Sequence, residues 1–273
     1  MESRLNIDFK DNRFLMFVID DKKEVIRLTL GKSELPLHED IIRVMQDALG
    51  DFSKSALVYP TGLPELKKEL SIYYKEQFGV EIPEKNFIIS LGTSSIFRNL
   101  FELLSCEEDE VLLPHPYYSL YKFSAMLAGA KIRYYNININ NRRLDFESFR
   151  RSFTPKTKIV VINTPGNPLG NVLTDEELYE IDYIVNGQAV IINDEIYSNV
   201  YFDQKNKSVM DLKNTKSTFI TTNSFSKAFR MYSRRVGYCI VPDEMIEPLT
   251  VIQHHTLLTV DPVVQFGIIQ CIS

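Results

Sequence analysis

The chain has 273 residues, 44% of them hydrophobic, which is enough apolar material for an ordinary globular core. Its formal net charge is -5 with acidic and basic residues interleaved, so it has no basic stripe of the kind that binds nucleic acid. The apolar run 14–19 is too short to span a bilayer, and the first ten residues lack the apolar core of a secretory signal. The three cysteines are an odd number without a CxxC pair, which argues against a disulfide framework or a zinc knuckle and favours a cytoplasmic location.

Two amphipathic helices are predicted before the first strand. Residues 37–50 place apolar side chains at 37, 41, 44, 45, 48 and 49, which is the spacing of one helix face. Gly50 suits the left-handed residue that often follows the last turn of a helix. Residues 64–79 repeat this design, with Pro64 at the start and Gly79 at the stop.

From residue 87 onward, short β-rich runs alternate with helical stretches. The candidate strands are 87–91, 110–114, 131–137, 158–163, 189–194, 218–223 and 236–242. Helical stretches lie between several of them, at 94–104, 118–129 and 174–187. Alternation of helices with nearly continuous apolar strands predicts an α/β fold with a mostly parallel sheet and helices on both faces.

Polar clusters follow four of the predicted strands. They are Gly92–Ser94, Asn163–Gly170, Asp194 and Ser224–Lys227. Because ligands of such sheets bind outside the carboxyl ends of the strands, we expect these clusters to meet at one rim. Each cluster alone is also compatible with an ordinary polar turn.

Lys227 lies just after a β-rich run and admits three interpretations. A lone lysine is usually solvated at the surface. Ser224 and Lys227 also fit the S-x-x-K signature of serine acyl-transfer enzymes, although the companion motifs S-D-N and K-T-G do not occur and the four histidines offer no obvious base. The third interpretation is a lysine that forms a Schiff base with a carbonyl cofactor, which needs a pKa lowered by burial or by a nearby cation such as Arg235.

The residues around Lys227 carry a family resemblance. The run KAFRMYSRRVGY, preceded by Ser224 and Ser226, resembles the stretch that follows the pyridoxal phosphate lysine in class I and II aminotransferases. Further motifs of this family occur in its usual order between about Leu28 and about Pro242. The resemblance implies the large domain of the aspartate aminotransferase-like fold (fold type I), a sheet of the seven-stranded type, and Lys227 linked to pyridoxal 5'-phosphate as an internal aldimine.

The same resemblance implies roles around the cofactor ring. Asp194, in a D-E-x-Y motif, would face the ring nitrogen, while Asn167 and Tyr197 would contact the ring hydroxyl. Tyr118 would stack on the ring, or Tyr117 if the register differs by one. Capping of the next turn by Asp194, turn chemistry around Asn167 and core packing of the tyrosines are the alternatives.

The cofactor phosphate needs amides and cations around it. A glycine that opens a helix after a strand presents N–H groups at the positive end of the helix dipole, as Gly92 would. An ordinary helix N-cap is the alternative there. The resemblance completes the phosphate site with Thr93, Ser94, Ser224, Ser226 and Arg235.

Two upstream segments also resemble the family. Gly31, at the end of Leu28–Gly31, would lie beside the substrate carboxylate, and Asn167 would contact the substrate as well. Tyr59 would reach the phosphate of a neighbouring subunit, which implies a homodimer with the active site at the subunit interface. The gap between Tyr59 and Gly62 is shorter than in most relatives, and local packing of this tyrosine is the alternative.

The chain departs from the family in two places. Ser233 stands where relatives usually carry glycine, and Arg230 and Arg234 stand where small or aromatic residues are common; solvation is the expected fate of these extra cations. Ser273 ends the chain inside an apolar stretch, so we expect a fragment in which the C-terminal small domain is largely missing. Residues 1–50 would form an N-terminal segment with part of the small domain, and residues 51–273 the cofactor-binding large domain.

The expected function is transfer of an amino group from an amino acid to a 2-oxo acid, with Lys227 as the base and Asp194 as support of the cofactor ring. The same architecture serves lyases, cyclases and synthases that act on amino acids, because the pocket chooses which bond breaks. A truncated remnant that binds the cofactor without turnover is the alternative from another class.

Overall fold

The computed structural model describes residues 31, 33 and 35–273. The apolar run 14–19 and residues 28–30 of the upstream motif lie outside the described residues, as does most of the proposed N-terminal segment 1–50. The division of the chain at residue 50 therefore stays a prediction. Within the described residues, no helix is long and apolar enough to cross a membrane.

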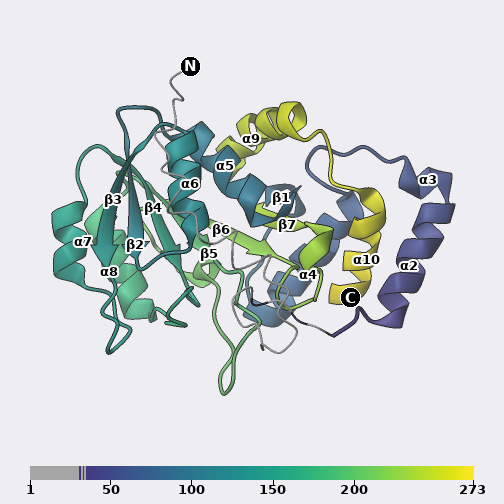
Figure 1. Cartoon of the computed structure of the whole chain (residues 1–273), viewed down its shortest axis with the longest axis horizontal. Helices are drawn as coiled ribbons and strands as arrows, with labels where there is room; N and C mark the ends of the chain where they lie inside the picture. Colours follow the sequence, from purple (N-terminus) through teal and green to yellow (C-terminus); the bar gives the residue numbers. More distant parts are fainter. Residues whose placement is uncertain (1–30, 32, 34) are drawn as a thin grey trace, which may run out of the picture.

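A single sheet of seven strands forms the centre of the described structure (Figure 1). The strand order is β1-β7-β6-β5-β4-β2-β3, and β7 is antiparallel to both of its neighbours while the pairs from β6 to β3 are parallel. The strands are β1 (Phe87–Ser90), β2 (Glu110–His115), β3 (Lys131–Asn136), β4 (Thr157–Asn163), β5 (Val190–Asp194), β6 (Phe219–Ser224) and β7 (Gly237–Ile240). All seven predicted strands are confirmed to within two residues at each end.

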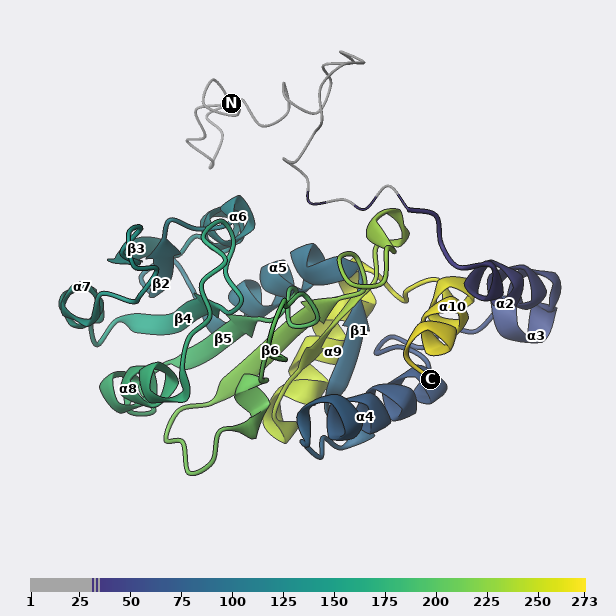
Figure 2. The same cartoon turned by 90° about the horizontal axis from the view of Figure 1, so that it is seen from below.

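Helices cover both faces of the sheet, as predicted. α5 (Gly92–Leu104), α6 (Ser119–Leu127) and α9 (Asp243–Thr256) pack on one face, and α4 (Pro64–Phe78), α7 (Phe146–Ser152), α8 (Asp175–Val185) and α10 (Pro262–Ile272) on the other (Figure 2). Neighbouring strand residues alternate between the two faces: Val111 and Leu113 join the core beneath α5, α6 and α9, and Leu112 joins the core beneath α7 and α8. Because the strands bury both faces, they read in the sequence as nearly continuous apolar runs.

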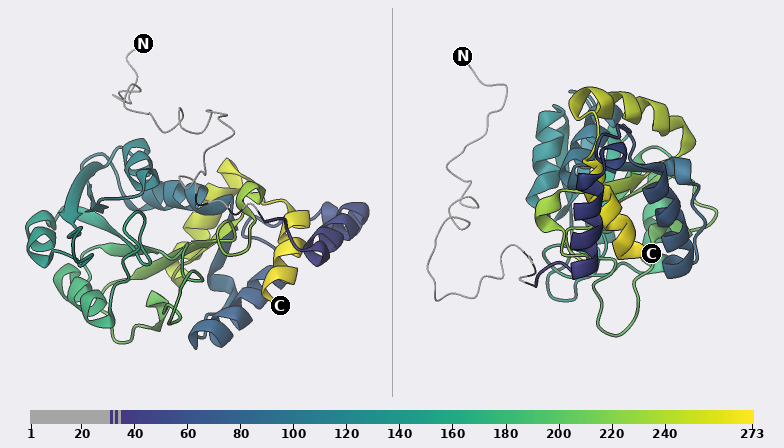
Figure 3. Two further views of the ribbon diagram at one scale, coloured as in Figure 1. Left: turned by 60° about the horizontal axis from the view of Figure 1, so that its bottom comes forward. Right: turned by 90° about the vertical axis from the view of Figure 1, so that its right-hand side faces the viewer.

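Four helices were not predicted from the sequence: the four-residue α3 (Phe52–Ser55), α7, α9 and α10. α7 spans only seven residues, and α9 contains Pro248, which normally argues against a helix interior. α10 is apolar on nearly all sides and has no helical periodicity to detect, because it is buried between α4 and α2 (Glu39–Gly50). Figure 3 shows α2 beside α10, and a Cβ on Gly267 would lie 2.7 Å from Cγ of Met45, so a larger residue there would force the Met45 side chain to move.

The two predicted helix stops had different outcomes. Gly79 ends α4 in the left-handed conformation with a φ of 71°, as expected. Gly50 was predicted wrongly, because it is the last residue of α2 and does not have a positive φ. Asp51 follows it in extended conformation, and its side chain accepts from Ser53 N to begin α3 (Phe52–Ser55). The next helix therefore starts at once and leaves no room for a left-handed turn.

Candidate active site

The polar clusters after β1, β4, β5 and β6 meet at one rim of the sheet, as the sequence predicts. These strands run in the same direction, so their carboxyl ends lie together, and antiparallel β7 begins at the same edge. A cavity of about 840 Å³ opens there. Its lining includes every site residue expected from the sequence except Tyr59: Gly31, Thr93, Ser94, Tyr118, Asn167, Asp194, Tyr197, Ser224, Ser226, Lys227 and Arg235.

Lys227 reaches this cavity from the turn after β6 and is partly buried. Its Nζ donates to the backbone oxygen of Gly31 at 3.3 Å and lies 5.3 Å from the centre of the Tyr232 ring. Burial lowers the pKa of this ammonium, the charge of Arg235 lowers it further, and the charge of Asp194 partly opposes both. A lowered pKa increases the fraction of neutral amine, which is the form that attacks a carbonyl or accepts a proton.

Asp194 ends β5 on the floor of the cavity and is 1% exposed. Oδ2 accepts from the Tyr121 hydroxyl at 2.8 Å, and Oδ1 accepts from Ile196 N at 3.2 Å. Burial raises the pKa of Asp194 to about 6, against the lowering effects of these hydrogen bonds and of Lys227. The carboxylate thus caps the next turn with one oxygen and faces the cavity, so the two interpretations of Asp194 do not exclude each other.

Two residues that support Asp194 received no role from the sequence. Tyr121 lies on α6 one turn after Tyr118, fully buried, and its phenol is directed at Asp194. Asn163, at the end of β4, donates to the backbone oxygen of Asp194 at 2.8 Å and accepts from Asn167 N at 2.6 Å. Both belong to recognised motif stretches, but only the fold brings their side chains to Asp194.

Tyr117 and Tyr118, which both line the cavity, make different ring contacts. The Tyr117 ring stacks on Tyr134 with centroids 5.3 Å apart. The Tyr118 ring is 36% exposed and meets Tyr121 edge-on at 5.8 Å. Tyr118 therefore presents the freer ring face and remains our candidate for stacking on a cofactor ring.

An anion-binding arrangement lies at the start of α5. The helix begins at Gly92, and its N-cap position, Leu91, makes no side-chain hydrogen bond, so the predicted alternative of an ordinary N-cap is wrong. Opposite, the Ser224 and Ser226 hydroxyls lie 2.8 Å apart. The uncapped N–H groups, the helix dipole and these hydroxyls offer donors for a phosphate.

Arg235 supplies the positive charge of this arrangement, Gly92 makes room for its guanidinium, and Gly237 makes room for Gly92. A Cβ on Gly92 would lie 2.8 Å from Nη2 of Arg235, and a Cβ on Gly237 would lie 2.9 Å from Cα of Gly92. Nη1 of Arg235 donates to Tyr232 O at 3.0 Å, which orients the guanidinium. The residues present therefore fit the phosphate of pyridoxal phosphate.

We expect Gly92→Ala to weaken cofactor binding at least about tenfold. Gly92 has a φ of 68°, which costs a non-glycine residue about 1–2 kcal/mol, and the new methyl group would displace Arg235. Titration of the purified protein with pyridoxal phosphate measures the effect. Gly50→Ala is the matched control, since a Cβ there meets nothing within 4 Å, and an unchanged affinity in both variants would contradict the prediction.

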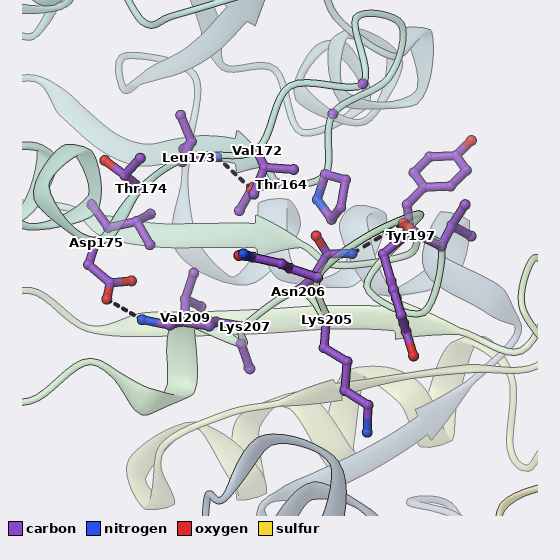
Figure 4. Close-up of a pocket in the computed structure, with 18 of the residues that line it drawn as sticks. Thr164, Val172, Leu173, Thr174, Asp175, Tyr197, Lys205, Asn206, Lys207 and Val209 are labelled. Atoms are coloured by element: carbon purple, nitrogen blue, oxygen red, sulfur yellow. Dashed lines mark hydrogen bonds and ion pairs between the residues drawn. The ribbon is translucent and has the colours of Figure 1, made fainter.

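Figure 4 shows the lining of a larger cavity, of about 980 Å³. It is walled by the loop 164–170, the start of α8 and the segment 197–209, where Lys207 contacts Asp175. The two cavities share Asn167 and Tyr197, but Lys227 and Asp194 line only the smaller one. We therefore locate the candidate chemistry in the smaller cavity.

Tyr59 is the one expected site residue that lies outside the cavity. It is 40% exposed, and its backbone N and O both contact the Thr259 hydroxyl, at 3.3 and 3.0 Å. Its expected contact is with a neighbouring subunit, so this role and the homodimer stay predictions. The described residues contain no cluster of histidine, cysteine and acidic side chains that could hold a metal ion.

Comparison with known proteins agrees with this geometry. Aspartate aminotransferase of Pyrococcus abyssi is 31% identical over 258 residues, which cover 93% of this chain and 66% of the relative. Aromatic-amino-acid aminotransferase 2 of Thermococcus litoralis is 32% identical over 230 residues, covering 82% of this chain and 59% of the relative. A solved structure of a double mutant of Thermus thermophilus aspartate aminotransferase superimposes with a TM-score of 0.83 at 26% identity, covering 90% of this chain and 64% of that one.

The chain thus spans less than two thirds of the length of these relatives. The family model for aminotransferase class I and II matches residues 23–266, which is most of the sequence. Members of this family use pyridoxal phosphate, the group that the cavity fits. The resemblance seen in the sequence is confirmed: the chain belongs to the aminotransferase class I and II family.

Proposed function

We propose that this chain acts in a pyridoxal phosphate-dependent aminotransferase that moves an amino group from an amino acid to a 2-oxo acid. The observation that carries the proposal is the meeting of Lys227 and Asp194 in one cavity, with the anion site of Arg235 and α5 in its wall. The matched relatives are named as aminotransferases, which favours this reaction over the lyase, cyclase and synthase alternatives.

The residues divide into those that hold the cofactor and those that move protons. Asp194 would keep the ring nitrogen protonated, and Asn167 and Tyr197 would hydrogen-bond the ring hydroxyl. When bound, pyridoxal phosphate supplies an electron sink for charge that develops at the substrate α-carbon. The phosphate ligands would be Thr93, Ser94, Ser224, Ser226, Arg235 and the first N–H groups of α5.

Lys227 would both carry the cofactor and act as the base. Because burial and Arg235 lower the pKa of this amine, Nζ is suited to take the proton from the substrate α-carbon and to return it on the product side. The Gly31 carbonyl, 3.3 Å away, would orient Nζ, and Gly31 and Asn167 would lie beside the substrate carboxylate. Tyr118 would cover the open face of the ring.

The assembly and location complete the proposal. A homodimer would bring the exposed Tyr59 of one subunit to the phosphate of the other. The three cysteines are unpaired, and the buried Cys239 is not available to a partner, which supports a reducing, cytoplasmic setting. Residues 51–273 would form the large domain around the sheet.

The acyl-transfer interpretation of S-x-x-K has less support. Ser224 is 4% exposed, and its hydroxyl donates to Val236 O at 3.1 Å. None of the described residues that line the cavity is a histidine. A β-lactam that labelled Ser224 would revive this interpretation.

The test is a spectroscopic titration of the purified chain. Loaded with pyridoxal phosphate, it should show a visible absorbance band that amino acids convert to the spectrum of pyridoxamine phosphate and that a 2-oxo acid restores. Colour that no amino acid converts would identify a non-catalytic remnant. Release of ammonia or carbon dioxide without pyridoxamine phosphate would point to the lyase alternative.

A further inference from the structure

Asp194 is followed by a second buried carboxyl group, that of Glu195. Asp194 lines the cavity, whereas Glu195 does not and is 0% exposed. Successive side chains of an extended chain point to opposite faces. Glu195 is still extended alongside β6, because its N donates to Thr222 O at 2.8 Å and so continues the hydrogen bonding between β5 and β6. The end of β5 thus carries one carboxyl toward the candidate chemistry and one away from it.

The two oxygens of Glu195 have unequal surroundings. Oε1 accepts from Val209 N at 2.8 Å and from Asn193 Nδ2 at 3.1 Å. The Ser208 hydroxyl lies 2.9 Å from Oε1 and 3.0 Å from Oε2, and it is the one hydrogen-bond partner of Oε2 among the described residues. A serine hydroxyl both donates and accepts, whereas the other two partners of Oε1 are N–H donors.

No positive charge compensates Glu195 in the part of the chain that the structure describes. No lysine, arginine or histidine there forms an ion pair or hydrogen bond with it. The titratable groups that interact with it are acids: Asp194 beside it, Tyr73 and Tyr74 on α4, and Tyr238 on β7. A buried carboxylate without a cation is costly, and the charge of Asp194 adds repulsion, whereas the three tyrosines have raised pKa values and stay neutral.

Every polar atom of the group is satisfied if Glu195 carries a proton. Oε2–H then donates to the Ser208 hydroxyl, which can donate onward to Oε1, and the two N–H groups remain on Oε1. Burial raises the pKa of Glu195 to about 7, above the value of about 6 for Asp194. Hydrogen bonds favour the charged form of both carboxyls, but Asp194 also has the positive charge of Lys227 nearby, which Glu195 lacks.

We propose that Glu195 is a neutral carboxylic acid in the folded protein and a positioning residue for the candidate active site. Two adjacent buried carboxyls do not both ionise without repulsion, so a proton held on Glu195 leaves the negative charge on Asp194. Glu195 also holds both ends of the segment 197–209, which carries Tyr197. Ser198 N donates to the backbone oxygen of Glu195 at 2.8 Å, and Val209 N donates to its side chain. The link to Asp194 rests on the proposed function, whereas the protonation does not.

Infrared difference spectroscopy tests the protonation directly, without cofactor or substrate. At about pH 6, wild type minus E195Q should contain the carbonyl stretch of a protonated carboxylic acid, and this band should be lost by about pH 8. E177Q is the matched control, because Glu177 is also buried but lies 3.1 Å from Arg143 and should give no such band. Absence of the band in the E195Q difference at pH 6 would overturn the proposal.

The pH dependence of stability provides a second readout. The folded pKa of Glu195 lies above the ordinary glutamate value of 4.5, so its stabilising contribution is fully present below about pH 4.5 and is lost as the pH rises through about 7. The folding constant of wild type relative to E195Q should therefore fall on the order of a hundredfold between about pH 5 and pH 8. A ratio that rises over this range would contradict a neutral Glu195.

Limited proteolysis tests whether residues 197–209 are held by a protonated Glu195 or by an ionised one. Lys205 and Lys207 are exposed, so trypsin reports opening of residues 197–209. E195Q keeps a donor and an acceptor in place and should be cut within about twofold of the wild-type rate, whereas E195A should be cut at least about tenfold faster. If E195Q were cut as fast as E195A, the negative charge would be the anchor and the proposal would be wrong.

An inactive wild type that still passes these tests would refute the proposed function alone.

Discussion

Lys227→Ala is expected to abolish covalent attachment of pyridoxal phosphate and to lower the rate of amino transfer by at least about 10²–10⁴-fold, the range that a positioned acid–base group contributes. The variant lacks the amine that lies near Gly31 and that carries the lowered pKa. Borohydride reduction followed by mass spectrometry should find the label on Lys227 of the wild type and on no lysine of the variant. Single-turnover conversion of the bound cofactor by an amino acid measures the rate.

Two controls separate chemistry from charge and from folding. Lys227→Arg keeps a cation in the cavity but cannot carry the cofactor, and it should be as inactive as the alanine variant. Lys213→Ala removes an exposed lysine that pairs with Asp211 at 3.6 Å, and it should leave activity unchanged. Wild-type turnover by Lys227→Ala would contradict the assignment of the lysine.

Asp194→Asn is expected to retain the cofactor but to lower the rate of amino transfer about 10²-fold or more, as loss of one preorganised electrostatic group does in other enzymes. Asparagine is nearly isosteric, so the contacts with Tyr121 and Ile196 can persist, but it cannot hold a proton on the ring nitrogen. Affinity for pyridoxal phosphate and the single-turnover rate, measured together, distinguish the two effects.

A buried aspartate elsewhere serves as the matched control for Asp194. Asp182 on α8 is 5% exposed and accepts from Ser217 N at 2.7 Å and Lys216 N at 2.9 Å. Asp182→Asn should lower the free energy of unfolding by about 1–3 kcal/mol while the activity of the folded fraction stays at the wild-type level. Equal activities of the two variants would contradict a special role of Asp194.

Tyr121→Phe is expected to shift the pH dependence of activity by changing the pKa of Asp194. The Tyr121 hydroxyl donates to the carboxylate and so favours its charged form; without it, the pKa of Asp194 rises above about 6. The acidic limb of the activity profile should move to higher pH by about one to two pH units, the equivalent of one hydrogen bond to a charged group. A profile that stays in place would indicate that Tyr121 only fills space.

The strands and the position of the site were readable in the sequence. Runs such as 158–163 are apolar and β-branched because both of their faces are buried, and this pattern survives without knowledge of the partners. Polar residues at 92–94, 163–170, 194 and 224–227 follow strands that point the same way, so their convergence follows from the topology of a parallel sheet. The motif around Lys227 added the family, which the match over residues 23–266 confirms.

The side-chain partners were decided by the tertiary structure alone. Whether Asp194 meets the phenol of Tyr121, and whether Gly92 leaves space for Arg235, depends on contacts between residues that the sequence places far apart. α9 and α10 were not predicted because their helical state also depends on tertiary packing. α9 contains Pro248 in its interior, and α10 is buried on nearly all sides, so it lacks a polar face. Local pattern determines which segments become strands and helices, but burial and long-range contacts determine which carboxyl carries a charge and which holds a proton.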